Sequence, residues 1–170
     1  RATDAAPTYR FHREALELLH WRCGPRRWML HAPIHTLTLD ALASAYPDAR
    51  FVMTHRDPVP VLGSTCSIIG FIRSLSSERR DPLGLGREQL SMWTLAMQTA
   101  IHFRERVGEQ RFADLHFREL NADPLGAVER CYARLGLPFT PQARKGIGEW
   151  GAARRRGRRG RHLYRLEDYG

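Results

Sequence analysis

The stretch RFVMTHRDPVPVLGS, residues 50–64, constrains the fold more than any other part of the chain. Its apolar start, FVM, predicts a short strand. Asp57 suits the N-cap of a helix, and Pro58 suits the first helical position, where the N–H that proline lacks would have no partner. The stretch therefore predicts a strand, a turn and a helix. Arg56 then ends the strand, and Ser64 lies in the early turns of the helix.

Strand and helix signals alternate along the rest of the chain. Helical apolar spacing, or an Asp-Pro or Thr-Pro start, predicts helices over residues 9–21, 36–45, 58–75, 87–107 and 123–135 and from 140 onward. We expect short strands at 28–30, 51–53 and 111–117, and a loop over 76–86 that can cover an active site. The alternation predicts an α/β fold, a parallel sheet flanked by helices, in a single domain over residues 1–170.

Four residues with functional side chains follow predicted strands. Ligands of parallel sheets bind at the carboxyl ends of the strands. We therefore expect His31, His35, Arg56 and Phe117 to face one crevice. An arginine beside a helix start favours an anion, and we expect a phosphate there.

Each of these side chains also has a purely structural interpretation. Arg56 can form an ion pair with Asp57 or Asp48 at the helix start. Ser64 can be a small residue that lets its helix pack closely, and His35 can cap or pack at the start of its own helix.

The chain of 170 residues has a net charge of +9, and its cations are almost all arginine. Arginine binds phosphate and sulfate through two parallel hydrogen bonds, so the charge indicates an anionic partner. Charge alone leaves nucleotides, nucleic acid and a membrane surface open. The basic run of residues 154–161 is compatible with a solvated tail or a nucleic-acid-binding arm. It has no interleaved aromatic residues, so we do not expect nucleic acid.

Three cysteines, Cys23, Cys66 and Cys131, lie far apart without metal-ligand spacing. This pattern indicates free thiols in a reducing compartment and no metal site. No apolar run approaches the roughly 18 residues of a membrane span, and no signal peptide opens the chain. We therefore expect a cytoplasmic protein without membrane contact.

Two segments resemble a known family, the sulfotransferases that use 3′-phosphoadenosine 5′-phosphosulfate (PAPS). In that family a strand ends in an arginine, and a serine eight positions later helps it to bind the cofactor's 3′-phosphate. Arg56 and Ser64 have this spacing, and the segment YPDARFVMTHRDP around Arg56 is similar to the bacterial branch. The segment FREL at 117–120, with Asp-Pro after it, resembles the family's Tyr-Glu-Asp-Leu segment, and the resemblance implies that Phe117 contacts the adenine.

Two further segments extend the resemblance. RRGRRG at 155–160 is similar to the family's Arg-Lys-Gly-x-x-Gly, which implies that Arg155 and Gly157 join the 3′-phosphate site. LHAP at 30–33 is similar to Leu-Lys-x-Pro, with His31 at the position of the lysine that assists the leaving oxygen. His35, on the same loop as His31, is the candidate base, since a histidine titrates near neutral pH. Cytosolic members of the family have their histidine two residues after the lysine, where this chain has Pro33.

The family's Gly-rich loop for the 5′-phosphosulfate has no counterpart in these residues. We therefore expect a P-loop-like sulfotransferase fold that is N-terminally incomplete. The expected function is transfer of a sulfuryl group from PAPS to a small-molecule acceptor with a hydroxyl or an amine. The alternatives are a non-catalytic fragment that binds the 3′-phosphoadenosine nucleotide and a basic nucleic-acid-binding protein. The acceptor and the oligomeric state stay open.

Overall fold

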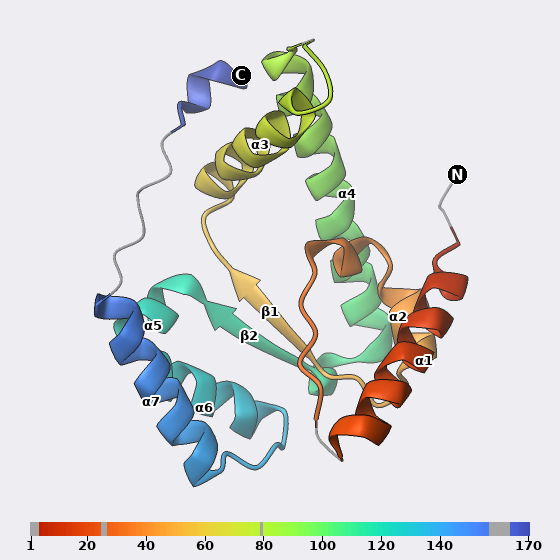
Figure 1. The fold of residues 1–170 in the computed structure, drawn as a ribbon, viewed down its shortest axis with the longest axis vertical. Helices are drawn as coiled ribbons and strands as arrows, with labels where there is room; N and C mark the ends of the chain where they lie inside the picture. Colours follow the sequence, from red (N-terminus) through yellow and green to blue (C-terminus); the bar gives the residue numbers. More distant parts are fainter. Residues whose placement is uncertain (1–3, 25–26, 79, 157–163) are drawn as a thin grey trace. The chain divides into compact units, whose positions relative to one another are not determined.

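The structure is a computed structural model that describes residues 4–24, 27–78, 80–156 and 164–170, with the backbone alone for 152–156 (Figure 1). It divides into two compact units. One comprises Arg1–Arg50 and Leu95–Glu109, and the other comprises Phe51–Thr94 and Gln110–Gly170. The single domain expected over residues 1–170 stays a prediction, and each unit is described by itself.

The first unit is helical. It contains α1 (Ala6–Cys23), η1 (Pro33–Leu37), α2 (Leu39–Ala45) and the second part of α4 (Pro82–Val107). Helix α1 packs against α2, and the buried side chains there include Tyr9, Leu39 and Leu42. The helix expected over residues 9–21 is confirmed. It ends at Gly24, whose φ of 77° glycine adopts without steric cost.

Two local expectations in the first unit are wrong. Residues 28–30 form no strand, and Met29 is 81% exposed. A strand needs a neighbour for its hydrogen bonds, and within the described residues β1 and β2 pair only with each other. The single helix expected over 36–45 is two pieces, η1 and α2. They are separated at Thr38, whose φ of −133° is outside the helical region.

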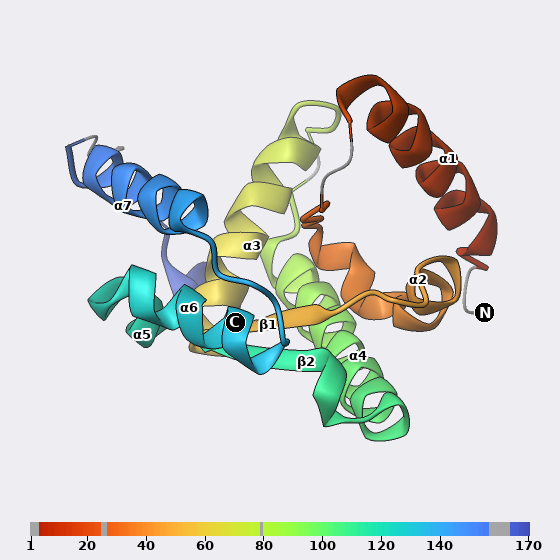
Figure 2. The same cartoon turned by 90° about the horizontal axis from the view of Figure 1, so that it is seen from below.

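The second unit is built on a parallel pair of strands, β1 (Phe51–His55) and β2 (Phe112–His116). The register pairs Phe51 with Phe112 at one end and His55 with His116 at the other. Figure 2 shows the two strands side by side. The parallel sheet and the α/β class are confirmed.

Helices follow both strands. The remaining elements of this part of the chain are α3 (Pro58–Ser74), η2 (Glu109–Arg111), α5 (Phe117–Ala122), α6 (Pro124–Arg134), α7 (Pro141–Arg156) and η3 (Leu166–Asp168). Helix α6 packs on β2, and α7 packs on α6. The buried core between β2 and α6 consists of Ala113, Leu115, Ala127, Cys131 and Leu135.

Capping side chains start four helices of the second unit. Asp57 accepts from Val59 N–H (3.1 Å), Asp123 from Gly126 N–H (2.9 Å), and Thr140 from Ala143 N–H (3.2 Å). These caps satisfy backbone donors that have no partner within the helix, as the Asp-Pro and Thr-Pro signals predict.

The fourth cap corrects the loop expected over residues 76–86. Asp81 accepts from Gly84 N–H (2.8 Å), and α4 begins at Pro82. The loop is therefore limited to the residues before Pro82. Asp81-Pro82 is the same start signal as at the other helices, and it outweighs the helix-breaking tendency of the two glycines that follow.

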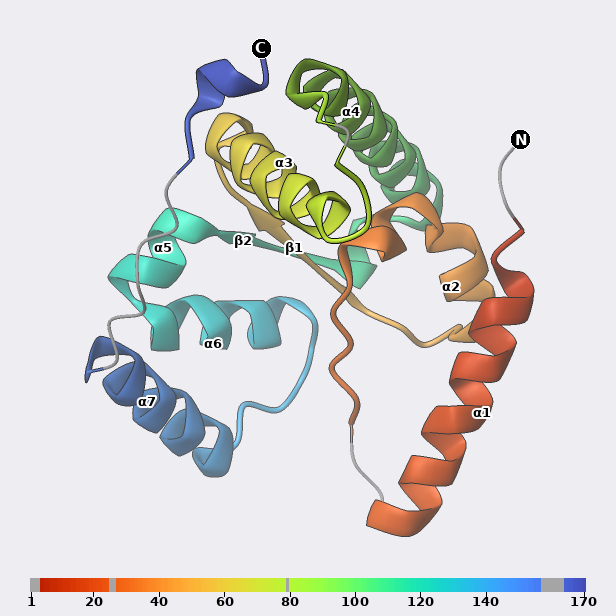
Figure 3. The same cartoon turned by 45° about the horizontal axis from the view of Figure 1, so that its top comes forward.

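The C-terminal segment of the second unit lies on α3 (Figure 3). Tyr164 Oη donates to the carbonyl oxygen of Pro60 (2.8 Å). Tyr164 and Leu166 cover Gly63 so closely that a Cβ there would overlap both side chains. The segment that follows the basic run is therefore anchored next to Ser64.

Candidate functional site

The β1–α3 junction places Arg56 directly after the last residue of β1. The Arg56 side chain is exposed, and within its unit no described carboxylate pairs with it. Among the described residues, Arg56 forms no ion pair with Asp57, whose carboxylate accepts the N–H of Val59. Asp48 belongs to the other unit. The guanidinium thus has donors available for a ligand.

The neighbouring strand places Phe117 beside Arg56, at the same end of the sheet. His55 and His116 are register partners, so the next residues, Arg56 and Phe117, leave the sheet side by side. The Arg56 Cζ atom lies 4.6 Å from the centroid of the Phe117 ring. Phe117 begins α5 and stays 37% exposed. The structure therefore brings together these two predicted site residues at the carboxyl ends of the strands.

Ser64 lies in the second turn of α3 and is half-buried. Its neighbour Gly63 is covered by the anchored C-terminal segment. Close packing is thus provided by Gly63, and a packing role does not require Ser64. The hydroxyl can donate to a phosphate oxygen.

The backbone at the start of α3 offers few free donors to an anion. The first four N–H groups of a helix have no intrahelical partner. Here Pro58 and Pro60 have no N–H, and the Asp57 carboxylate accepts that of Val59 (3.1 Å). The anion-binding hypothesis therefore depends on the side chains of Arg56 and Ser64, and the helix start contributes less than the sequence suggests.

The predicted residues of the basic run are only partly described. Arg155 lies in the last turns of α7, for which the structure gives the backbone alone, and Gly157 lies outside the described residues. Sequence reasoning missed Tyr164, whose hydroxyl anchors the chain after this run to α3. The isolated aromatic residues after the charged run were the available signal.

Of the two candidate histidines, His35 has the surroundings that better suit a general base. Its Nδ1 atom is 2.7 Å from the hydroxyl of Tyr9, which also lies 2.8 Å from Thr38 Oγ1. Burial lowers the pKa of His35 below its usual 6.5, and the nearby charges of His12 and His31 lower it further. His35 is therefore neutral at neutral pH, as a general base must be.

His31 lies in the extended segment before η1 and is exposed. His31 and His35 belong to the first unit, whereas Arg56, Ser64 and Phe117 belong to the second. The single crevice expected for both groups stays a prediction.

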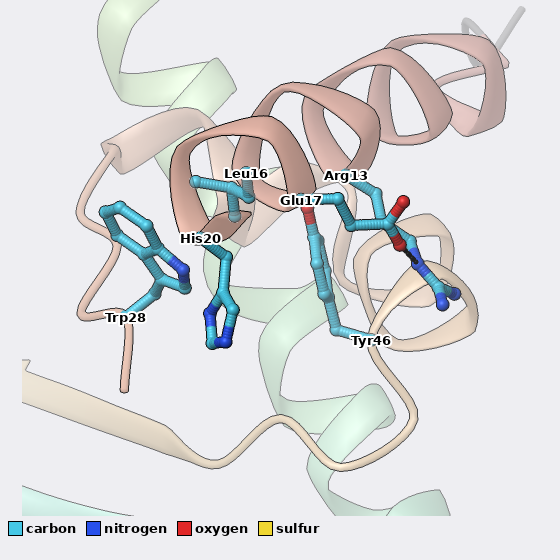
Figure 4. Close-up of a pocket in the computed structure, with 6 residues that line it drawn as sticks. All are labelled: Arg13, Leu16, Glu17, His20, Trp28 and Tyr46. Carbon is cyan, nitrogen blue, oxygen red and sulfur yellow. Dashed lines mark hydrogen bonds and ion pairs between the residues drawn. The ribbon is translucent and has the colours of Figure 1, made fainter. Parts of the chain in front are cut away.

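The first unit also has a groove of about 170 Å³, shown in Figure 4. It is lined by Arg13, Leu16, Glu17, His20, Trp28 and Tyr46. The rings of Trp28, His20 and Tyr46 lie in a row beneath α1. Arg13 and Glu17 pair with each other (2.9 Å). None of the predicted site residues lines this groove.

Three properties of the described residues bear on the remaining expectations. The three cysteines are free thiols, with Cys66 and Cys131 buried and Cys23 exposed. Among the helices that the structure describes, none is both long and apolar enough to cross a membrane. The described side chains contain no group of three or more His, Cys, Asp or Glu residues suited to a metal ion.

Comparison with known proteins identifies the family. The profile of the sulfotransferase family matches residues 2–141. The chain therefore belongs to the sulfotransferase family, as its arginine and serine motifs indicate.

Two mycobacterial relatives have the same degree of similarity. The chain is 30% identical over 112 residues to omega-hydroxy-beta-dihydromenaquinone-9 sulfotransferase Stf3 of Mycobacterium bovis and of Mycobacterium tuberculosis. The match covers 64% of this chain and 28% of each relative.

Two solved structures share the fold. Sulfotransferase STF9 from Mycobacterium avium superposes with a TM-score of 0.84 at 31% identity, over 99% of this chain and 43% of that one. Sulfotransferase STF1 from M. tuberculosis H37Rv gives a TM-score of 0.84 at 30% identity, over 98% and 42%. The sulfotransferase fold is confirmed, and the chain spans less than half the length of these proteins.

Proposed function

We propose that this chain binds the 3′-phosphoadenosine part of PAPS and contributes to transfer of its sulfuryl group to a hydroxyl or an amine. The observation that supports this most directly is the contact between Arg56 and Phe117 at adjacent strand ends, 4.6 Å apart. Within the described residues of its unit this arginine has no carboxylate partner, and an aromatic ring lies beside it. The two side chains match the two parts of the nucleotide, its phosphate and its base.

In the donor site, Arg56 binds the 3′-phosphate through paired N–H groups, and Ser64 donates its hydroxyl. Phe117 offers its exposed ring edge and remaining face to the adenine. Arg155 and Gly157 extend the phosphate site from the basic run, and Tyr164 anchors the segment after this run to α3. PAPS supplies the transferable sulfuryl group, and these residues hold its nucleotide.

In the transfer step, His35 is the base and His31 lies beside the leaving oxygen. The lowered pKa of His35 keeps its imidazole neutral, so that it can take the proton of the acceptor hydroxyl. His31 is exposed and can donate a hydrogen bond to the departing oxygen in the place of the family's lysine.

The name of the Stf3 relative indicates the first acceptor to test. That relative is named for an omega-hydroxy dihydromenaquinone, which is an alcohol on an apolar carrier. We propose that an alcohol on an apolar carrier is also the acceptor class of this protein. Phenols, sugars and amines are the comparison set.

Calorimetry with adenosine 3′,5′-bisphosphate tests the donor site. Arg56→Ala should weaken binding about 10- to 100-fold, since hydrogen bonds to a charged group contribute about 1.5–3 kcal/mol. Arg118→Ala is the matched control, because it removes an exposed positive charge from the residue next to Phe117. The proposed donor site would be contradicted if the wild-type protein did not bind the nucleotide, or if Arg56→Ala and Arg118→Ala lost the same affinity.

A sulfate-transfer assay tests the reaction. His35→Gln should abolish transfer while nucleotide affinity stays unchanged. Binding of the nucleotide without transfer to any acceptor in the panel would support the non-catalytic alternative. A steep fall of affinity with salt would instead indicate that the ligand is nucleic acid, because many phosphates are then neutralised.

A further inference from the structure

One face of the β1–β2 ladder ends in a pair of histidines. Side chains alternate along a strand, so residues 51, 53 and 55 share a face with 112, 114 and 116. At one end Phe51 stacks on Phe112, with ring centroids 5.0 Å apart and 22° between the planes. At the other end His55 stacks on His116 at 5.0 Å and 28°. The two cross-strand pairs have the same geometry at opposite ends of one ladder.

Asp114 adds a hydrogen bond at the histidine end. His55 Nε2 lies 2.6 Å from Asp114 Oδ1, so the imidazole N–H donates to the carboxylate across the strands. Asp114 is two residues before His116 on the same face and is the diagonal neighbour of His55. A stack fixes the distance between the two strand ends, and the hydrogen bond also fixes the direction of the ring.

Chain connectivity gives this cluster a position directly before the candidate donor site. Arg56 follows His55, and Phe117 follows His116. Arg56 and Phe117, whose side chains are in contact at 4.6 Å, therefore each directly follow one of the two stacked histidines. A shift of one strand end along the ladder would move the guanidinium off the ring.

We propose that His55 and Asp114 are positioning residues that hold Arg56 over Phe117 and thereby set the affinity for the adenosine bisphosphate. This inference rests on the proposed function of Arg56. Neither His55 nor Asp114 needs to contact the nucleotide. Their hydrogen bond orders the exposed guanidinium before the ligand arrives, and less binding energy is then spent on ordering it.

Three variants separate the hydrogen bond from the stack. His55→Phe keeps an aromatic ring on His116 but removes the donor. His55→Gln keeps a donor that can reach Asp114, and Asp114→Ala removes the acceptor. Phe51→Leu is the matched control, since it removes the stack at the far end of the same ladder.

Calorimetry with adenosine 3′,5′-bisphosphate gives the first measurement. His55→Phe and Asp114→Ala should each weaken binding about tenfold, and the double variant should lose no more than either alone. His55→Gln should restore affinity to near that of the wild type. Phe51→Leu should lower thermal stability without changing affinity. Wild-type affinity in His55→Phe, or an equal loss in Phe51→Leu, would overturn the inference.

NMR of the ligand-free protein gives a measurement that does not depend on nucleotide binding. The Phe117 ring should shift the side-chain N–H resonances of Arg56, because the guanidinium lies over its face. His55→Phe should reduce this ring-current shift, whereas Phe51→Leu should preserve it. A preserved shift in His55→Phe refutes the positioning role. If His55→Phe loses the ring-current shift as expected but the wild-type protein binds no nucleotide, the proposed function alone is refuted.

Discussion

Gly63 provides the sharpest test of how the C-terminal segment is held. A Cβ on Gly63 would overlap Leu166 Cδ2 and lie 2.6 Å from Tyr164 Cε2. The tyrosine ring cannot move aside freely, because its hydroxyl donates to Pro60 O (2.8 Å). We expect Gly63→Ala to displace residues 164–170 from α3.

The magnitude follows from the contacts that would be lost. The hydrogen bond contributes about 1 kcal/mol, and the contacts of the Tyr164 and Leu166 side chains with α3 contribute about 1 kcal/mol each. Alanine returns up to about 1 kcal/mol through its higher helix propensity. Gly63→Ala should therefore destabilise the protein by about 2 kcal/mol. Gly70→Ala is the matched control in the same helix, since its Cβ would meet Leu85 Cδ2 at an ordinary 3.5 Å.

Urea unfolding and hydrogen exchange measure the two consequences. The unfolding free energies of Gly63→Ala and Gly70→Ala should differ by about 3 kcal/mol, with Gly70→Ala at or above the wild type. The peptide that covers residues 164–170 should lose protection in Gly63→Ala alone. Equal stability of the two variants, or retained protection in Gly63→Ala, would refute the reasoning.

Three further predictions concern thiols, a helix cap and pH. Burial raises the pKa of the Cys66 and Cys131 thiols, so a thiol reagent at mildly alkaline pH should modify Cys23 alone until urea is added. Rapid modification of all three in the native protein would contradict this burial. Asp81→Ala should cost about 1 kcal/mol in urea unfolding because α4 loses its N-cap, whereas Asp81→Asn should be close to neutral. Burial, followed by the charges of nearby histidines, lowers the pKa of His35 below 6.5, so the unfolded chain is protonated first as pH falls. The free energy of unfolding should therefore decrease from about pH 6.5 down to the folded-state pKa, and His35→Gln should remove that part of the pH dependence.

Helix starts were predictable because a cap is a local interaction. Asp57, Asp123 and Thr140 each bond to an amide two or three residues later, so the sequence contains both partners. Asp81-Pro82 has the same signal, but the glycines that follow it favour a loop. The structure explains one of them, because a Cβ on Gly86 would collide with the carbonyl of Tyr169. That reason involves a residue far along the chain.

Strand and helix continuity were less predictable. The apolar residues 28–30 have strand composition, yet a strand forms only where another strand supplies hydrogen bonds. The apolar spacing over 36–45 has no feature that marks the break at Thr38. Both outcomes depend on what surrounds the segment in space, which periodicity does not report.

By itself, the sequence determined that Arg56 follows a strand, that Asp57 and Pro58 start a helix, and that the charge suits an anion. These properties depend on residues within a few positions of one another. The tertiary structure decided that Arg56 lies over Phe117, since the two come from strands far apart in the chain. Parallel pairing fixes this result, because only the register aligns the two strand ends.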